Sequence, residues 1–369
     1  GGRQFMAMSS GKVNTTELVA ALINQKDDFV SGIKHAQESI DGSLTLLIIT
    51  QDGQIIAARD KVGRLPVLIG KSDDGFCISF ESFAYHKLGY RDEYELGPGE
   101  IVLVNPDEYR TISPAGDKMK ICAFLWVYYG YPNSNYEGVN VEVMRYRNGA
   151  IMARDEAAAG GVPELDYVAG VPDSGVPSAM GYAFESGIPY ADGIVKNRYV
   201  GRTFIEPTQA MRQLGIRLKL NPLRSVIEGK RLVVIDDSIV RGNTSKKLVQ
   251  MLRDAGAAEV HLRIVSPEVL WPCFYGIDTD TRDQLIAANM DLGEMNAWIG
   301  SDSLAFISLE GLRASVPDAR RQGFCDACFT GDYPVAIPDS VAKKSLLTKK
   351  DFEETYGEGA ADEARPRTR

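Results

Sequence analysis

A strand-like run that ends in two adjacent carboxylates is the feature that most constrains how this chain can fold. Residues 231–235 read Arg-Leu-Val-Val-Ile, an Asp-Asp pair follows, and residues 238–245 read Ser-Ile-Val-Arg-Gly-Asn-Thr-Ser. Apolar residues at helical spacing then continue until Gly256, a typical residue for the end of a helix. Ligands of α/β proteins bind at the carboxyl ends of parallel strands. The segment therefore predicts a strand, a ligand-binding loop and a helix within a parallel sheet.

The loop has the composition of a phosphate site with room for a metal ion or a sugar beside it. A turn that contains glycine lets backbone N–H groups converge on an anion, and the start of a helix adds partial positive charge. Asp236 and Asp237 suit ribose hydroxyls and a Mg²⁺ ion that bridges pyrophosphate oxygens. A solvated acidic turn before a capped helix is the alternative, and the length of the whole string favours the ligand site. The donors expected in the cradle are Gly242, Asn243, Thr244 and Ser245.

The rest of the chain divides into two styles of sequence. Apolar runs separated by turn residues fill residues 44–104, and with one helix near Thr16–Asn24 they predict a β-rich region. From about Tyr167 short apolar strands alternate with helical stretches, which is typical of parallel βαβ units. The tail, residues 348–369, is charged and rich in Ala, Glu and Arg, so we expect it to be disordered. The expected fold class is α+β for the first part and α/β for the second.

Composition excludes some classes of partner. The net charge of −9 gives no basic excess for binding nucleic acid, and no apolar run reaches the roughly eighteen residues that suggest a membrane span. Five cysteines, an odd and sparse set, occur without a visible signal peptide, so we expect a cytoplasmic protein. Cys325 and Cys328 form a CxxC pair, which leaves a zinc ion, an iron–sulfur cluster or plain buried thiols open.

Several strings together resemble one enzyme family. Residues 234–245 are similar to the 5-phosphoribosyl-1-pyrophosphate (PRPP) signature of type I phosphoribosyltransferases. Residues 196–205, Lys-Asn-Arg-Tyr-Val-Gly-Arg-Thr-Phe-Ile, resemble the flexible loop of glutamine PRPP amidotransferases, also called amidophosphoribosyltransferases. The strings Gly-Val-Pro-Asp-Ser at 170–174, Cys-Phe-Tyr-Gly-Ile-Asp at 273–278 and Cys-Asp-Ala-Cys-Phe-Thr-Gly at 325–331 fit the same family. The resemblance extends from about Thr16 to Pro334 and so covers most of the chain.

The resemblance implies two domains and a tail. Residues 1–115 would form part of an N-terminal-nucleophile (Ntn) glutaminase-type domain, which is rich in β-strands. Residues 116–347 would form a type I phosphoribosyltransferase domain with a mainly parallel sheet and a C-terminal cysteine segment, and residues 348–369 would be the disordered tail.

The implied reaction is the first committed step of purine synthesis. Ammonia, which the full-length enzyme takes from glutamine, displaces pyrophosphate from ribose C1 of PRPP and gives 5-phosphoribosylamine. The transition state has oxocarbenium character, so positioning and charge neutralisation carry the catalysis.

On composition alone the cations after residue 195 could be a solvated basic loop; the resemblance makes them a lid that closes over PRPP. The implied catalytic residues are Lys196, Arg198 and Arg202; the PRPP contacts are Asp236, Asp237, Ser238, Arg241, Gly242, Asn243, Thr244 and Ser245; and the Mg²⁺ site is Ser174, Asp236 and Asp237. The family usually has Thr at position 243, where Asn still offers a backbone N–H and a side-chain donor.

The cysteines gain a second implied role from the same resemblance. The cluster-containing branch of the family carries cysteines in contexts similar to those of this chain. The implied ligands of a structural 4Fe-4S cluster are Cys122, Cys273, Cys325 and Cys328. Cys77 falls outside this set, and we expect it in the core. The cluster would join the C-terminal segment to both domains.

The start of the chain departs from the family pattern. The family's glutaminase uses a cysteine at the first position of the mature chain as nucleophile, whereas this sequence begins with Gly1 and has no cysteine before Cys77. Thr15 also stands where the family has an aspartate that helps to bind glutamine. We therefore expect an N-terminally truncated member that, as given, does not hydrolyse glutamine but can use free ammonia.

Two other functions remain as alternatives. A non-catalytic relative that only binds PRPP or nucleotides would not need the cationic lid, which the chain retains at Lys196. A base-salvage phosphoribosyltransferase would share the acidic loop but typically lacks the β-rich first domain and the cysteine set. The family resemblance further implies inhibition by purine nucleotides and a homo-oligomer, either a dimer or a tetramer.

Overall fold

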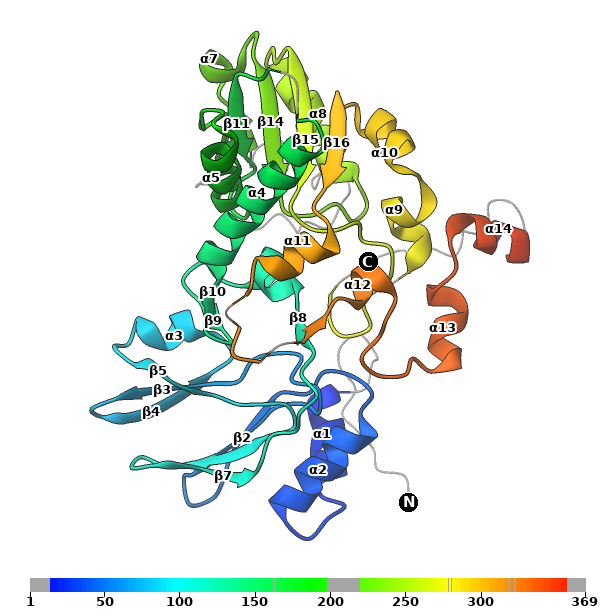
Figure 1. The fold of residues 1–369 in the computed structure, drawn as a ribbon. Helices are drawn as coiled ribbons and strands as arrows, with labels where there is room; N and C mark the ends of the chain where they lie inside the picture. Colours follow the sequence, from blue (N-terminus) through cyan, green and yellow to red (C-terminus); the bar gives the residue numbers. More distant parts are fainter. Residues whose placement is uncertain are drawn as a thin grey trace.

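The computed structural model describes residues 14–161, 164–197, 220–277, 279, 281–317, 319–321 and 323–356. In Figure 1 the antiparallel strands of the N-terminal part lie at one end of the molecule and the parallel sheet lies at the other. Short strands and helices from the middle and the end of the chain lie between them. No helix in the described ranges is long and apolar enough to cross a membrane.

The N-terminal part contains two antiparallel sheets. The first has the order β1-β2-β6-β7 and the second the order β4-β3-β5. Their bounds are β1 Leu46–Ile49, β2 Ile55–Ala58, β3 Leu68–Ser72, β4 Gly75–Ser79, β5 Arg91–Glu95, β6 Ile101–Val104 and β7 Tyr109–Ser113. Helices α1 (Thr15–Ile23) and α2 (Phe29–Ser39) contribute to the core on one face of the first sheet. Short helix α3 (Ser82–His86) follows β4.

Strand β2 explains why the sequence of this region shows continuous apolar runs and not alternating apolar and polar residues. Ile56 and Ala58 contribute to the core shared with α1 and α2, whereas Ala57 contributes to a separate core with Val67 and Ile69. Both faces of β2 are therefore buried, and a strand buried on both faces needs apolar residues at every position. The predicted β-rich region and the early helix are confirmed, the helix to within one residue at each end.

The C-terminal part is built on a four-stranded parallel sheet with the order β11-β14-β15-β16. The strands are β11 Tyr167–Gly170, β14 Arg231–Asp236, β15 Glu259–Ile264 and β16 Ser303–Phe306. Alternate residues of β14 face opposite cores: Leu232 packs with α8 (Asn243–Asp254) and α10 (Leu292–Ile299), and Val233 packs with α4 (Val141–Ala158) and α5 (Gly175–Ser186). Helices thus cover both faces of the sheet (Figure 1), which confirms the expected α/β class.

Segments from distant parts of the sequence meet between the two sheets. Strand β8 (Ile121–Cys122) pairs in parallel with β17 (Phe324–Cys325), and a π-helical turn, Leu125–Tyr129, follows β8. The hairpin β9 (Asn135–Tyr136) and β10 (Val139–Asn140) leads into α4. The remaining elements are β12 Ile194–Lys196, β13 Leu220–Pro222, α7 Arg224–Ile227, a 3-10 turn at Arg282–Gln284, α9 Ile286–Asn289, α11 Leu309–Ala314, α12 Ala327–Thr330, α13 Asp339–Ser345 and α14 Lys349–Tyr356.

Helix α14 corrects the expectation that the whole tail from residue 348 is disordered. Thr348 caps it: its hydroxyl oxygen accepts from the Asp351 N–H at 3.2 Å, and its backbone N–H donates to the Asp351 carboxylate at 3.0 Å. The Lys349 N–H also donates to Asn289 Oδ1 at 2.7 Å. These polar contacts cap and anchor a charged helix, which the composition of the tail alone did not indicate. The part of the tail from residue 357 onward lies outside the described residues.

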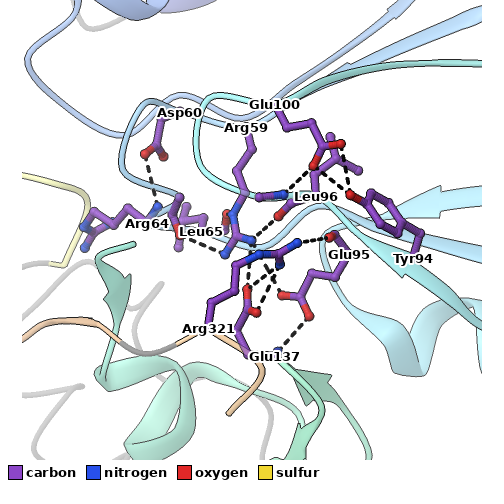
Figure 2. A network of polar contacts seen from close by, with 12 residues as sticks. Arg59, Asp60, Arg64, Leu65, Tyr94, Glu95, Leu96, Glu100, Glu137 and Arg321 are labelled. Atoms are coloured by element: carbon purple, nitrogen blue, oxygen red, sulfur yellow. Dashed lines mark hydrogen bonds and ion pairs between the residues drawn. The ribbon is translucent and has the colours of Figure 1, made fainter. Parts of the chain in front are cut away.

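A buried ionic network connects the N-terminal sheets with the hairpin β9–β10 and the segment before β17 (Figure 2). Arg59 is fully buried, and its guanidinium lies 3.1 Å from Glu137 Oε1 and 3.8 Å from Glu95 Oε1. Arg321 reaches Glu137 Oε2 at 3.2 Å. Burial, and then the neighbouring Glu137, raise the pKa of Glu95 to about 8. Three segments that are far apart in sequence thus share one network of acidic and basic side chains.

Candidate functional site

The acidic pair lies where the sequence predicts it, at the carboxyl end of the central strand β14. Asp236 ends the strand and Asp237 begins the loop, and both side chains are almost fully buried. The Asp237 N–H donates to Asp236 Oδ1 at 3.0 Å. Burial raises the pKa of both carboxyls, and the neighbouring charge of Asp237 adds to the effect on Asp236. Two buried carboxylates with raised pKa values indicate a site that would be stabilised by a cation.

Ser174 reaches the same pair from the neighbouring strand. The loop after β11 brings its hydroxyl to Asp237 Oδ2, to which it donates at 2.5 Å. The loop can approach this closely because Gly175 has no side chain: a Cβ there would lie 2.5 Å from the carbonyl oxygen of Ile235. The string that reads as a simple turn in the sequence therefore places a hydroxyl beside the acidic pair.

The glycine turn begins α8 with the conformation that an anion cradle needs. Gly242 has φ +74°, a left-handed conformation that favours glycine. A Cβ on Gly242 would also lie 2.7 Å from Ile286 Cδ1 and 2.8 Å from Trp298 Cζ3. The first N–H groups of an α-helix have no partner within the helix, so the start of α8 presents free donors to this loop. Asn243 and Thr244 are exposed there.

The other loop residues have different surroundings. Ser238 donates to Asp237 Oδ1 at 2.5 Å and so belongs to the acidic pair's immediate contacts. Arg241 is exposed and donates from Nε to Gln284 Oε1 at 3.0 Å. Ser245 is buried on the inner side of α8, whereas Asn243 and Thr244 are exposed. The Ser245 hydroxyl is therefore not accessible to solvent.

The predicted lid is described only at its start. Lys196 ends β12, and its ammonium group forms an ion pair with the Asp173 carboxylate. Asp173 directly precedes Ser174, so Lys196 pairs with a neighbour of the residue that contacts Asp237. Arg198 and Arg202 lie outside the described residues.

Arg145 on α4 is a neighbour of the site that sequence reasoning missed. It is buried, and it donates to the carbonyl oxygens of Trp126 at 2.8 Å, Tyr128 at 3.1 Å and Gly130 at 3.0 Å. Its positive charge also lowers the pKa of Asp237, against the larger effect of burial and beside the hydrogen bonds from the serines. In the sequence it is simply an arginine within a helix. A single sequence does not distinguish an arginine that faces the core from an arginine that faces solvent.

Trp298 on α10 is a second neighbour that the sequence did not reveal. Its ring lies against Gly242 and 4.4 Å from the ammonium group of Lys246, measured to the ring centroid. This contact holds a positive charge beside the glycine turn at the start of α8.

The four cysteines of the predicted cluster gather at the centre of the molecule. Cys122 and Cys325 are register partners in the parallel pair β8–β17. The Cys328 carbonyl accepts hydrogen bonds from the backbone N–H groups of Leu270 and Trp271, which lie just before Cys273. Arg64 Nη2 lies 3.8 Å from Cys122 Sγ and 3.6 Å from Cys273 Sγ. All five cysteines of the chain are free thiols, and burial raises the pKa of Cys122 to about 11.

These thiols do not form a compact site for a single metal ion. Within the described ranges, no group of three or more His, Cys, Asp or Glu side chains is close enough to hold one ion. Zinc–sulfur bonds of about 2.3 Å place the sulfurs of a zinc site within about 4 Å of one another. The described thiols therefore do not show the arrangement of a zinc site.

Comparisons with known proteins agree on one family. Residues 155–266 match the phosphoribosyl transferase domain family. The chain is 40% identical to an amidophosphoribosyltransferase of Archaeoglobus fulgidus, with 91% of this chain and 73% of the relative covered. It is 42% identical to an amidophosphoribosyltransferase of Bacillus subtilis, with 90% and 71% covered. Its fold is similar to the structure of a glutamine PRPP amidotransferase from B. subtilis complexed with ADP and GMP, with a TM-score of 0.80, 40% identity, and 92% of this chain and 73% of that chain covered.

Proposed function

Because the chain belongs to the amidophosphoribosyltransferase family, we propose that PRPP binds at the end of β14 and that ammonia displaces its pyrophosphate there. The observation that carries this assignment is the joint placement of Ser174, Asp236 and Asp237 beside the glycine turn of α8. An acidic pair for the ribose and metal and a donor-rich turn for the 5-phosphate are the two halves of a phosphoribosyl site.

The residues around the acidic pair fit a magnesium ion. Mg²⁺ in phosphate-transferring sites is held by one or two carboxylates, keeps several waters and takes further oxygens from the substrate. Asp236, Asp237 and the Ser174 hydroxyl would hold it, and the ion would compensate the charge of two buried carboxylates. When bound, the ion neutralises negative charge on the departing pyrophosphate.

The lid supplies the rest of the charge neutralisation. Lys196 is paired with Asp173 in the described state, so it must leave that carboxylate to reach the pyrophosphate. We assign Arg198 and Arg202 to the same role from the sequence pattern. Closure of this loop would exclude water, which competes with ammonia at ribose C1.

The phosphate cradle is assigned from the geometry of the turn. Gly242, Asn243 and Thr244 would donate to the 5-phosphate with their N–H groups, and the exposed side chains of Asn243 and Thr244 add donors. Arg241 would leave Gln284 to contact the pyrophosphate. Ser245 would contribute through its backbone, since its hydroxyl is buried.

Regulation and assembly are proposed from the relatives. The B. subtilis structure was solved with ADP and GMP, and a purine nucleotide carries the ribose 5-phosphate that PRPP shares. We therefore expect purine nucleotides to compete with PRPP at this site.

A dimer or tetramer stays a prediction. A cytoplasmic location also stays a prediction; the five free thiols favour it because free thiols suit a reducing compartment.

The four-cysteine site is assigned to a 4Fe-4S cluster. Cys122, Cys273, Cys325 and Cys328 supply the four thiolates that such a cluster needs. The charges of the other three thiols act on Cys328, so the four groups lie near one another. The cluster would join the strand pair β8–β17 to the loop at Cys273 and so fix the segments between the two sheets. Anaerobically purified protein with neither iron nor visible iron–sulfur absorbance would overturn this assignment.

The test of the proposed function separates turnover from binding. PRPP, Mg²⁺ and ammonium chloride are supplied without glutamine, and pyrophosphate release is measured alongside PRPP binding by calorimetry. The enzyme assignment expects binding and ammonia-dependent release of pyrophosphate. Binding without release would favour the non-catalytic relative, and release that requires a free purine base instead of ammonia would favour a salvage enzyme.

A further inference from the structure

We propose that Arg64, a residue of the N-terminal part, is the fixed positive charge of the four-cysteine site and that it sets the reduction potential of the group bound there. This inference rests on the iron–sulfur assignment above. It concerns a residue that no cysteine motif includes, from a turn that lies more than fifty positions before the first of the four cysteines.

The turn after β2 holds Arg64 in place from its backbone. Its N–H donates to Asp60 Oδ1 at 3.1 Å, and its carbonyl oxygen accepts from the N–H of Cys122 at 3.0 Å. In Figure 2 the Arg64 side chain extends away from the Arg59 network. The backbone of one cluster ligand and the side chain of Arg64 are therefore tied to the same turn.

The guanidinium faces sulfur on one edge and a carbonyl on the other. Nη2 donates to the sulfurs of Cys122 at 3.8 Å and Cys273 at 3.6 Å, and Nη1 donates to the carbonyl oxygen of Tyr275 at 3.0 Å. The Tyr275 ring stacks at 4.9 Å from the guanidinium carbon. Cys325 also interacts electrostatically with the same group.

The charge balance points to an anionic group at this position. Arg64 is 3% exposed, and an arginine stays protonated even when it is buried. Among the described residues no carboxylate lies within ion-pair distance of its guanidinium, and its Nε has no hydrogen-bond partner. A buried charge without an opposite charge is strongly destabilising. Four thiolates on an iron–sulfur core carry a net negative charge, so the bound cluster supplies the missing counter-charge.

Two consequences follow from a cation that donates to cluster sulfurs. Reduction adds negative charge beside Arg64, so the guanidinium stabilises the reduced state and raises the reduction potential, which hydrogen bonds to sulfur also tune. The contact also shields two of the four ligands and orients their side chains, and removal of such outer partners commonly weakens metal binding by about 10- to 100-fold. Arg64 is thus a positioning residue of the cluster.

The experiment compares Arg64→Met, Arg64→Lys and the control Lys61→Met, which removes a half-exposed cation of the same turn that pairs with Asp41. Each protein is purified anaerobically and assayed for iron, for the reduction potential by titration followed with electron paramagnetic resonance, and for the rate of cluster loss in air. Arg64→Met should lower the potential and speed cluster loss by about tenfold. Arg64→Lys should recover most of the potential but little of the stability in air, because it keeps the charge and loses the two-sulfur geometry.

The outcomes separate the inference from its premise. Wild-type protein without iron overturns the cluster assignment. Wild-type protein with iron, together with a potential in Arg64→Met equal to that of Lys61→Met, overturns the role of Arg64 alone. If Arg64→Met does not fold, Arg64→Lys decides: a rate of cluster loss equal to that of wild type contradicts the inference.

Discussion

At the scale of single residues, Asp237 of the proposed phosphoribosyl site is held on both of its carboxylate oxygens. Ser174 and Ser238 donate to its two oxygens, and the charge of Arg145 lies near it. These contacts leave the carboxylate few orientations, which suits a ligand that must bind a metal ion in the same way at every turnover. Ser174 matters because it comes from the loop after β11, whereas Ser238 directly follows Asp237 in the chain.

Ser174→Ala should raise the Mg²⁺ concentration needed for half-maximal pyrophosphate release by about tenfold, since the ligand carboxylate loses its orienting partner and the ion loses a hydroxyl. Titration of Mg²⁺ at saturating PRPP and ammonia measures the effect. Ser186→Ala, at the exposed end of α5, is the matched control and should behave as wild type. An unchanged magnesium requirement in Ser174→Ala would contradict the placement of the metal.

Residue roles could be predicted from the sequence only where neighbours in sequence act together. Asp236, Asp237 and Gly242 share one strand–loop–helix unit, so their spacing alone predicts a ligand site. Arg64 and Arg145 act on groups far away in sequence. An arginine inside a fold looks the same in the sequence as one on its surface, so neither could be identified without the structure.

At the scale of elements, the tight packing of α4 against α5 positions the loop that carries Ser174. A Cβ on Gly149 would lie 1.8 Å from the Ser178 carbonyl oxygen, and one on Gly181 would lie 1.9 Å from the Tyr146 carbonyl oxygen. The two helices therefore touch through their backbones. Helix α4 was not predicted, because it buries polar residues such as Arg145 and Asn148 and so lacks the apolar periodicity that marks a helix in sequence.

Gly149→Ala and Gly181→Ala should each lower the free energy of unfolding by about 1–3 kcal/mol, since the added methyl group forces the helices apart. Urea denaturation followed by circular dichroism measures the loss. Gly293→Ala in the first turn of α10 is the control: its Cβ would meet only Asp291 Oδ1 at 3.3 Å, and alanine there should be neutral or slightly stabilising. Equal stability in all three variants would show that α4 and α5 are not in backbone contact.

At the scale of the whole molecule, charged side chains connect parts that the sequence separates widely. The network of Arg59, Glu95, Glu137 and Arg321 joins the N-terminal sheets to the hairpin before α4 and to the segment before β17 (Figure 2). The division into a β-rich part and a parallel α/β part could be predicted, because each depends on local periodicity. The way the two parts meet could not, since it depends on buried ion pairs that carry no local pattern.

Glu95 makes this junction sensitive to pH. Its pKa is about 8 in the folded state against 4.5 for an ordinary glutamate, first because it is buried and then because Glu137 is near. Between these two values the folded state holds a proton that the unfolded state has released, so stability falls as the pH rises through this range. Glu95→Gln removes the titrating group and should flatten the decline.

The measurement is the unfolding midpoint in urea of wild type and Glu95→Gln between pH 5 and 9. The difference between the two proteins isolates Glu95 from other groups, including Asp236 and Asp237, whose pKa values are also raised. Wild type should lose more stability than Glu95→Gln as the pH rises to about 8. Parallel curves would contradict a protonated Glu95 in the fold.

The central claim is that the acidic pair at the end of β14 serves a displacement of pyrophosphate from PRPP by ammonia. The most direct measurement is the rate of pyrophosphate release at saturating PRPP, Mg²⁺ and ammonia for wild type and Asp236→Asn/Asp237→Asn, with Asp254→Asn at the exposed end of α8 as control. We predict a loss of at least about a hundredfold in the double variant and none in the control. Equal rates of release in wild type and the double variant would contradict the claim.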